Sequence, residues 1–407
     1  IVQTFNNVVD ITLDPASLAL EPGIGNRPER LEWFRDQALG MFIHWGLDSL
    51  LGTVPSHWMI GADPALVDRF IHEIPGWFKP SAFDPGIWAR LARQAGMRYA
   101  CLTTKHHSGF CMFDTVTTEF NVMRTPHGRD IVAEYVEACR TYDVHPGLYF
   151  SPLDFHWCHG QGKPLHFFTP DVLPANNPGL MQYNLAQIRE LLSRYGEIAT
   201  VFFDGPPEQL RELAWELQPE IVVTRGAMET PEQHLPEAPL PEAWEACCTI
   251  GDGWSYKPTN DTVKTGAELI DMLIRTRAFG GNLLLNVTPD PDGRIPIEQQ
   301  RVLQELGTWL FFNGEAIYHT RPWHTPHEDK IWYTRAKHGD TVYAFVTGAP
   351  WPHGHFGRRT VTLRGVRATP DSQIAMLGQN DILEHQPDAD TAIRWHQDNA
   401  ALHIDAM

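Results

Sequence analysis

Short apolar runs alternate with amphipathic stretches from residue 39 to about residue 314. This alternation is typical of repeated βα units, in which the strands form a parallel sheet and helices cover it. Between the apolar runs, residues such as Ile87, Leu91 and Ala95 recur at helical spacing. The segments expected to be strands are 40–45, 99–106, 146–151, 200–204, 221–224, 246–250 and 282–287. The pattern predicts an α/β protein with a (β/α)8-like (TIM-type) barrel in which one unit is irregular.

The pattern changes after residue 322. Gly and Pro punctuate alternating segments at 330–336, 341–346 and 360–363, which predicts antiparallel strands. A chain of 407 residues also exceeds the size at which a single core usually stops growing. We therefore expect two domains, a catalytic (β/α) barrel over residues 1–322 and a C-terminal β-sandwich over residues 323–407.

The charge of the chain narrows the choice of partners. Fifty acidic and 32 basic residues give a formal net charge of -18, which disfavours nucleic acid and anionic membrane surfaces. No apolar run approaches the roughly 20 residues that span a bilayer, so we expect a soluble protein. The first ten residues lack the features of a signal peptide, which leaves the cytoplasm and export after removal of a leader both open. A homo-oligomer is also left open.

Polar side chains end several of the apolar runs, where a barrel of this kind carries its catalytic groups. Asp204 directly follows Val201-Phe202-Phe203, and a carboxylate there costs several kcal/mol unless it meets polar groups. An Asp-Gly turn that closes the strand is the alternative explanation. The residues at or near strand ends are His44, His106, His107, Tyr149, Asp154, Asp204, Arg225 and Glu245.

Glycoside hydrolysis needs two carboxyl groups, one that attacks the sugar or activates water and one that protonates the leaving oxygen. Asp204 is the candidate for one of them, and Glu245 is its candidate partner. The loop over residues 228–242 offers competing acid/base candidates, and the sequence leaves the choice open. These are Glu229, Glu232, Glu237 and Glu242.

Adjacent histidines at 106 and 107 raise the question of a metal site, since imidazole is a common metal ligand. Neighbouring strand side chains point to opposite faces, and no HxH or HExxH pattern is present. We therefore predict no metal and no other cofactor, with the histidines bonded to sugar hydroxyls. A structural role for each histidine, and a structural ion pair for Arg225, remain alternatives.

Several separate motifs lie along the chain in the order in which a known family has them. Segments 40–46 (GMFIHWG) and 104–110 (TKHHSGF) are specific, and further motifs lie at 147–151, 203–205, 249–256, 281–286 and 313–318. Over about residues 32–323 they resemble family 29 glycoside hydrolases, the α-L-fucosidases. The resemblance implies a barrel followed by a β-sandwich, a metal-free mechanism that retains configuration, and Asp204 as the nucleophile.

The resemblance also implies roles for other residues. A Glu five positions before Ile250 serves as acid/base in the subgroup that favours α-1,3/1,4-linked fucose, and here that residue is Glu245. An apolar patch is expected to face the C5 methyl group of fucose. The residues expected to contact the sugar are His44, Trp58, His106, His107, Tyr149, Phe202, Arg225 and Trp254.

The chain departs from the family pattern at three places. Many members have Glu-Trp where this chain has His57-Trp58, Asp where it has Ser108, and Trp where it has Phe202. The expected function is removal of terminal α-L-fucosyl residues from oligosaccharides or glycoconjugates. An α-L-galactosidase, a non-catalytic fucose-binding protein and a metal-dependent barrel hydrolase are the alternatives. The linkage and the aglycone are not indicated.

Overall fold

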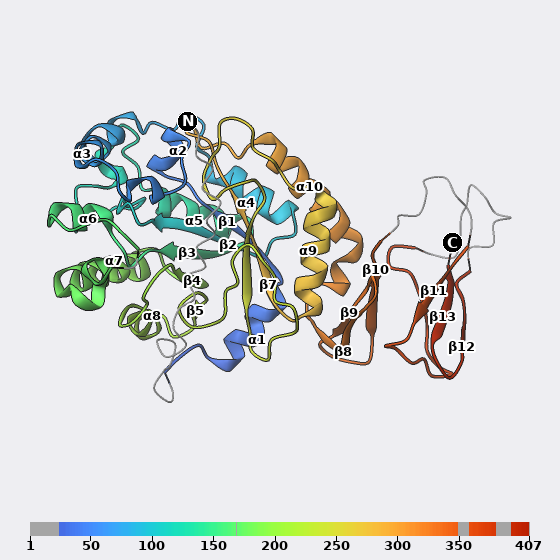
Figure 1. The fold of residues 1–407 in the computed structure, drawn as a ribbon. Coiled ribbons are helices and arrows are strands. Elements are labelled where there is room, and N and C mark those ends of the chain that lie inside the picture. Colours follow the sequence, from blue (N-terminus) through green and yellow to red (C-terminus); the bar gives the residue numbers. More distant parts are fainter. Residues whose placement is uncertain (1–23, 168, 349–357, 380–391, 407) are drawn as a thin grey trace.

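A curled sheet of seven parallel strands forms the larger part of the molecule (Figure 1), and the computed structural model describes residues 24–167, 169–348, 358–379 and 392–406. The order along the sheet is β5-β4-β3-β2-β1-β7-β6, and each neighbouring pair is parallel. The strands are β1 (Leu39–Ile43), β2 (Tyr99–Lys105), β3 (His145–Phe150), β4 (Thr200–Phe203), β5 (Val222–Val223), β6 (Glu245–Thr249) and β7 (Asn282–Val287). Every strand predicted in this region is confirmed.

Helices pack around the outside of the sheet (Figure 1). Asp84 and Asp130 begin two of them, because each side chain accepts a backbone N–H of the first turn. The α-helices are α1 (Pro28–Gln37), α2 (Leu47–Leu51), α3 (Pro64–Glu73), α4 (Pro85–Gln94), α5 (Ile131–Thr141), α6 (Phe155–Gly160), α7 (Pro178–Arg194), α8 (Leu210–Leu217), α9 (Gly266–Ala278) and α10 (Ile297–Asn313). Short 3-10 helices are η2 (His57–Met59), η3 (Ile74–Trp77), η4 (Val122–Arg124), η5 (Pro170–Val172), η6 (Pro174–Asn176) and η7 (Gly314–Ala316).

The sheet buries a separate core on each face. Alternate residues of a strand point to opposite faces, so one set packs under the helices and the other fills the concave side of the curl. The concave cluster is rich in aromatic side chains, which are large enough to fill the space within a curled sheet. Its buried members include Phe42, Tyr99, Tyr149 and Phe202.

The two edge strands, β5 and β6, meet an irregular segment. Residues 229–232 run parallel to β6 through bridges between Glu229 and Trp244 and between Glu232 and Cys247. The amide of Cys247 donates a hydrogen bond of 2.9 Å to the carbonyl of Pro231. The sequence predicted a loop here, and its first part lies along the sheet edge instead. The α/β class is confirmed, and closure into an eight-stranded barrel stays a prediction.

Two three-stranded antiparallel sheets follow the parallel sheet, as the alternating segments predicted. Tyr333, Leu363 and Leu402 form a buried cluster contributed by both. Arg321 and Lys337 each form an ion pair of 2.7 Å with Asp36, which joins these strands to α1. The strands are β8 (Thr320–Glu328), β9 (Ile331–Ala336), β10 (Val342–Val346), β11 (Arg359–Leu363), β12 (Arg394–Gln397) and β13 (Leu402–Ala406).

The predicted division between residues 322 and 323 falls inside β8 and stays a prediction. Among the described residues, no helix combines the length and the apolar character needed to cross a membrane.

Candidate active site

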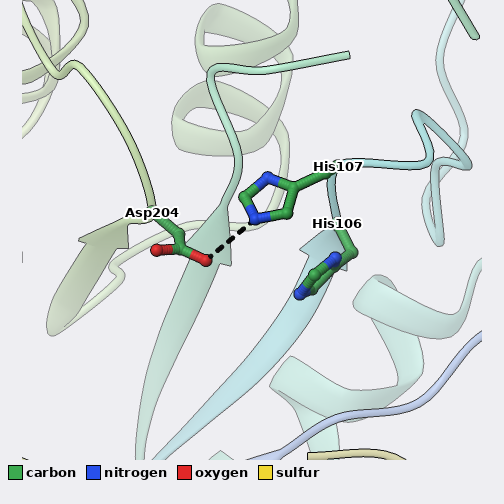
Figure 2. A group of neighbouring side chains, drawn as sticks. All are labelled: His106, His107 and Asp204. Carbon is green, nitrogen blue, oxygen red and sulfur yellow. Dashed lines mark ion pairs between the residues drawn. The ribbon is translucent and has the colours of Figure 1, made fainter. Parts of the chain in front are cut away.

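The carboxyl edge of the parallel sheet gathers most of the polar residues singled out in the sequence. Parallel strands end at the same edge, so residues that follow different strands meet there. His44 follows β1, His106 and His107 follow β2, Asp204 follows β4, and Arg225 lies just beyond β5. Figure 2 shows the side chains of Asp204 and His107 pointing toward each other, with His106 beside them.

Asp204 is the central group of this edge. Its backbone amide donates to the carbonyl of Phe150, which extends the strand pairing by one residue. The next residue, Gly205, has φ of 138°, a conformation that a side chain would strain. The sequence offered an Asp-Gly turn and a catalytic carboxylate as alternatives, and in the structure the chain bends at Asp204-Gly205 with the carboxylate directed at polar groups.

Three side chains hold the Asp204 carboxylate. The Tyr149 hydroxyl donates to Oδ2 over 2.7 Å, the His107 Nε2 atom lies 3.3 Å from the same oxygen, and Arg225 donates to Oδ1 over 3.0 Å. Burial opposes ionisation, but the hydrogen bond and charge of His107 and the charge of Arg225 outweigh it. They hold the pKa of Asp204 well below its usual value. The carboxylate is therefore ionised at neutral pH.

Arg225 links Asp204 to a second carboxylate. One terminal nitrogen bonds Asp204, and the other lies 2.9 Å from Oε2 of Glu232. The guanidinium is fixed by Thr230, whose hydroxyl accepts from Nε over 3.0 Å, and it lies 4.6 Å above the ring of Phe202. A rigid planar fork of this kind keeps the two carboxylates close together. Glu232 was one of four alternatives in the loop, and it is the one that reaches the site.

The histidines differ in their bonding. His44 Nδ1 lies 2.7 Å from Oδ1 of Asn286, whose amide nitrogen donates to the Trp254 carbonyl. The Asn286 oxygen accepts, so the His44 hydrogen lies on Nδ1 and Nε2 is left as an acceptor. Burial lowers the pKa of His44 to about 4, which makes the ring neutral at physiological pH.

His106 lies flat against Tyr149, with ring centroids 5.3 Å apart and an interplanar angle of 8°. Its Nδ1 atom is 2.9 Å from the Ser56 hydroxyl, which also accepts the amide of Ser108. Burial lowers the pKa of His106 well below its usual value, so this ring too is neutral. The ring therefore sits in a fixed orientation beside Asp204.

The three predicted aromatic contacts are placed differently from one another. Trp254, in the segment after β6, lies 5.0 Å from His44 between ring centroids. Phe202 is 2% exposed, and its ring packs against the Arg225 guanidinium. Trp58 is half-buried, and its indole N–H donates to Asp48 over 3.0 Å. The sugar-contact roles of all three stay predictions.

Glu245 lies apart from this group, and its role as acid/base stays a prediction. It is the first residue of β6, and its Oε1 accepts a hydrogen bond of 2.6 Å from Tyr99, the first residue of β2. At a rise of about 3.3 Å per residue, the carboxyl end of β6 is about 13 Å away. The sequence argument treated Glu245 as a residue near a strand end, whereas the strand begins there.

Ligand atoms of His106, His107 and Asp204 all lie within 4.8 Å of one another, which is close enough for a metal ion. The His107 Nε2 atom already lies 3.3 Å from Asp204, and Tyr149 and Arg225 occupy further positions around the same carboxylate. This donor set is that of a hydrogen-bonded ion pair. The absence of a metal stays a prediction.

Some residues of the site were missed in the sequence. Ser56, Ser151, Thr230 and Asn286 orient His106, His107, Arg225 and His44, respectively. Ser151 and Asn286 lie at strand ends inside two of the motifs, which was a usable signal. Ser56 and Thr230 lie in loops with no periodic pattern to mark them.

Comparison with known proteins agrees with this geometry. The family model described as Alpha-L-fucosidase matches residues 24–315. The tissue alpha-L-fucosidase of Mus musculus is 31% identical over an alignment of 392 positions that covers 85% of this chain and 83% of that protein. The tissue alpha-L-fucosidase of Homo sapiens is 30% identical over an alignment of 418 positions that covers 91% of this chain and 86% of that protein.

Solved structures give the same result. Alpha-L-fucosidase isoenzyme 1 from Paenibacillus thiaminolyticus superposes with a TM-score of 0.70 at 26% identity, covering 93% of this chain and 98% of that one. An alpha-L-fucosidase from Bacteroides thetaiotaomicron, trapped as a covalent intermediate, shares the fold with a TM-score of 0.75 at 22% identity over 96% and 95% of the two chains. This chain belongs to the alpha-L-fucosidase family.

Proposed function

We propose that this chain is a retaining exo-α-L-fucosidase in which Asp204 is the nucleophile and Glu232 is the acid/base. One observation carries the proposal: Arg225 bonds Asp204 with one terminal nitrogen and Glu232 with the other, at the carboxyl edge of the sheet. Retaining glycosidases need two carboxyl groups roughly 5 to 5.5 Å apart, and one guanidinium that binds both supports such a spacing.

In the first step, an oxygen of Asp204 bonds to C1 of the sugar while the bond from C1 to the leaving oxygen breaks. Glu232 gives its proton to that oxygen. In the second step, Glu232 takes a proton from water, the water oxygen bonds to C1, and the bond to Asp204 breaks. Both carboxyl groups return to their initial state, and two inversions leave the anomeric configuration unchanged.

The donors around the two carboxylates support these assignments. Asp204 accepts hydrogen bonds from Tyr149 and Arg225 and lies beside His107, which stabilises its charged form. Asp204 is therefore assigned as the anion, and Glu232 as the group that supplies the proton. The group without a proton is then the one that attacks, and the group with a proton is the one that assists departure.

The surrounding side chains suit a fucosyl ring. His44 offers an acceptor at Nε2 to a sugar hydroxyl, and Tyr149 and Arg225 donate to Asp204 and hold it toward the reacting carbon. The ring of Trp254 beside His44 provides an apolar surface for the C5 methyl group. The expected substrates are fucosylated oligosaccharides or glycoconjugates.

We also infer the complete architecture from these contacts. Residues 229–232 bridge to β6 and follow directly on β5, so they take the position of an eighth strand in a barrel. The cluster of Tyr333, Leu363 and Leu402 between the two antiparallel sheets supports a C-terminal β-sandwich.

Covalent labelling tests the proposal. Incubation with 2-fluoro-fucosyl fluoride should leave a fluorofucosyl group on the proteolytic peptide that contains Asp204, measured by mass spectrometry. Asp204→Ala should remain unlabelled and lose about four orders of magnitude in kcat on an aryl α-L-fucoside. Labelling of any other carboxylate, or unchanged turnover of Asp204→Ala, would overturn the assignment.

A further inference from the structure

Ser151 is a buried residue that follows β3 and touches the reacting group only through His107. Its Oγ lies 2.8 Å from the carbonyl oxygen of Leu153 and 2.5 Å from Nδ1 of His107. The residue is completely buried, so no solvent competes for these two bonds. The position of the single hydroxyl hydrogen of Ser151 therefore determines which nitrogen atoms of His107 are protonated.

A serine hydroxyl has a single hydrogen, and a carbonyl oxygen can only accept. The Ser151 hydrogen therefore lies between Oγ and the Leu153 carbonyl. Oγ must then act as the acceptor toward His107, which places a hydrogen on Nδ1 of the imidazole. If the Oγ hydrogen pointed at Nδ1 instead, the Leu153 carbonyl would lose its hydrogen bond from Ser151.

The other nitrogen of His107 faces Asp204. Nε2 lies 3.3 Å from Oδ2, and the Asp204 carboxylate carries no proton because its pKa is held well below the usual value. A bare Nε2 would turn its lone pair toward an anionic oxygen, which is repulsive. Nε2 must therefore carry a hydrogen as well.

We infer that Ser151 is a positioning residue that keeps His107 doubly protonated, as an imidazolium, beside the nucleophile. This inference rests on the proposed role of Asp204. Before the sugar binds, the Nε2–H group of the charged His107 holds Oδ2 of Asp204 in place. When Asp204 forms the glycosyl ester and loses its charge, this Nε2–H group becomes free to donate to a sugar oxygen.

The groups around His107 fit one cation at this position. The anionic partner in contact is Asp204, and Arg225 lies beyond it on the same carboxylate. The three other imidazoles nearby have lowered pKa values because of burial, so they add no competing charge. They are His44, His57 and His106.

The remaining neighbours are acidic or aromatic. Asp48 lies close enough to feel the charge of His107, and burial raises its pKa to about 6. The rings of Phe155 and Phe167 pack 6.1 Å and 5.0 Å from the imidazole and exclude water from that side. Tyr149 shares Oδ2 of Asp204 and stays protonated, because burial and the Asp204 charge raise its pKa.

The consequence is an alkaline limit on activity. Loss of the Nε2 proton from His107 leaves the Nδ1–H group donating to Ser151 Oγ and turns the Nε2 lone pair toward Asp204. We therefore expect kcat/KM for an aryl α-L-fucoside to fall as His107 is deprotonated. Ser151→Ala removes the acceptor that stabilises the charged ring, so the alkaline midpoint of the profile should move to lower pH by about one unit.

Protein labelled with 15N-histidine provides a readout that is independent of turnover. In the wild-type protein at pH 7, the signal that disappears in His107→Gln should show both ring nitrogens protonated. A neutral tautomer for that residue would overturn the inference, whatever the activity. Failure of covalent labelling at Asp204 would instead overturn the proposed nucleophile and leave this charge state measurable.

Two further variants complete the experiment. Ser151→Thr keeps the hydroxyl and should keep the wild-type alkaline midpoint. Ser49→Ala is the matched control, since Ser49 is 1% exposed and its hydroxyl has no hydrogen-bond partner in the described structure. An alkaline midpoint of Ser151→Ala that is unchanged or higher contradicts the inference. The wild-type histidine spectrum tests it even if Ser151→Ala does not fold.

Discussion

The Tyr99 hydroxyl donates a hydrogen bond of 2.6 Å to Oε1 of Glu245 at the amino ends of their strands. The other carboxyl oxygen of Glu245 has no hydrogen-bond partner within the described part of the chain. Burial raises the pKa of Glu245 to about 7, so the group binds a proton inside the sheet through much of the physiological range. We therefore expect Glu245 to affect the stability of the protein at high pH.

The pH dependence of stability follows from that pKa. The ordinary value is 4.5 and the folded value is about 7, so the folded state binds the proton more tightly than the unfolded state. The contribution of Glu245 is fully present below about pH 4.5 and is lost as pH rises through 7, at a cost of about 3 kcal/mol. Glu245→Gln should remove most of this loss.

Urea unfolding followed by tryptophan fluorescence at pH 5 and pH 8 measures the effect. The decrease in unfolding free energy between the two pH values should be smaller in Glu245→Gln by about 2 kcal/mol. Glu229→Gln, an exposed change in the neighbouring segment, serves as the control. If Glu245→Gln shows the wild-type pH dependence, the buried carboxyl is not the cause.

Turnover by the same variants distinguishes the two acid/base candidates. Glu232→Gln should lose about 10²- to 10⁴-fold in kcat/KM on an oligosaccharide, because the leaving oxygen needs a proton. The loss should be much smaller on a dinitrophenyl fucoside, whose leaving group departs without one. Glu245→Gln and Glu229→Gln should each stay within about tenfold of wild type on both substrates. A leaving-group dependence in Glu245→Gln would restore that residue as the candidate.

The planar guanidinium of Arg225 leads to a prediction that depends on the geometry of this group as well as on its charge. Arg225→Lys keeps the positive charge but offers a single ammonium group, which cannot bond Asp204 and Glu232 through a rigid planar fork. Loss of one charged hydrogen bond corresponds to roughly tenfold to a hundredfold in kcat/KM. Steady-state kinetics on an aryl fucoside measure it, and full activity of the lysine variant would show that the link between the carboxylates is dispensable.

Metal dependence can be tested directly, because His106, His107 and Asp204 are close enough to hold an ion. Since Tyr149 and Arg225 already bond the carboxylate and His107 lies 3.3 Å from it, dialysis against a strong chelator should leave kcat and KM unchanged. Elemental analysis of the dialysed enzyme gives the matching metal content. Activity that disappears with the chelator and returns with a divalent metal would contradict the proposed mechanism.

Sugar specificity depends on a single hydroxyl. An α-L-galactoside carries a hydroxymethyl group where a fucoside has a methyl group, and apolar pockets discriminate against an added hydroxyl by only about 10². Aryl α-L-fucoside should therefore be favoured by about that factor in kcat/KM. Equal rates on both glycosides would identify the pocket as unselective at C5. A panel of α-1,2, α-1,3, α-1,4 and α-1,6 fucosylated oligosaccharides would add the linkage preference.

The sequence determined the strands and singled out Asp204. Apolar runs mark buried strands wherever they occur, and Asp204 stands out because a carboxylate at the end of such a run requires polar partners. The histidines at 44, 106 and 107 could be listed for the same reason. Local patterns were sufficient here because each of these features is set within a few residues.

Only the tertiary structure decided which glutamate joins Asp204. Glu232 and Glu245 are 13 residues apart, and no local pattern tells that one lies beside Arg225 and the other beside Tyr99. That difference depends on the register of residues 229–232 against β6, which long-range pairing sets. The bond from His107 to Ser151 is equally non-local, since it joins the ends of two strands 44 residues apart. Contacts of this kind arise from how strands align, and a sequence read residue by residue does not contain that alignment.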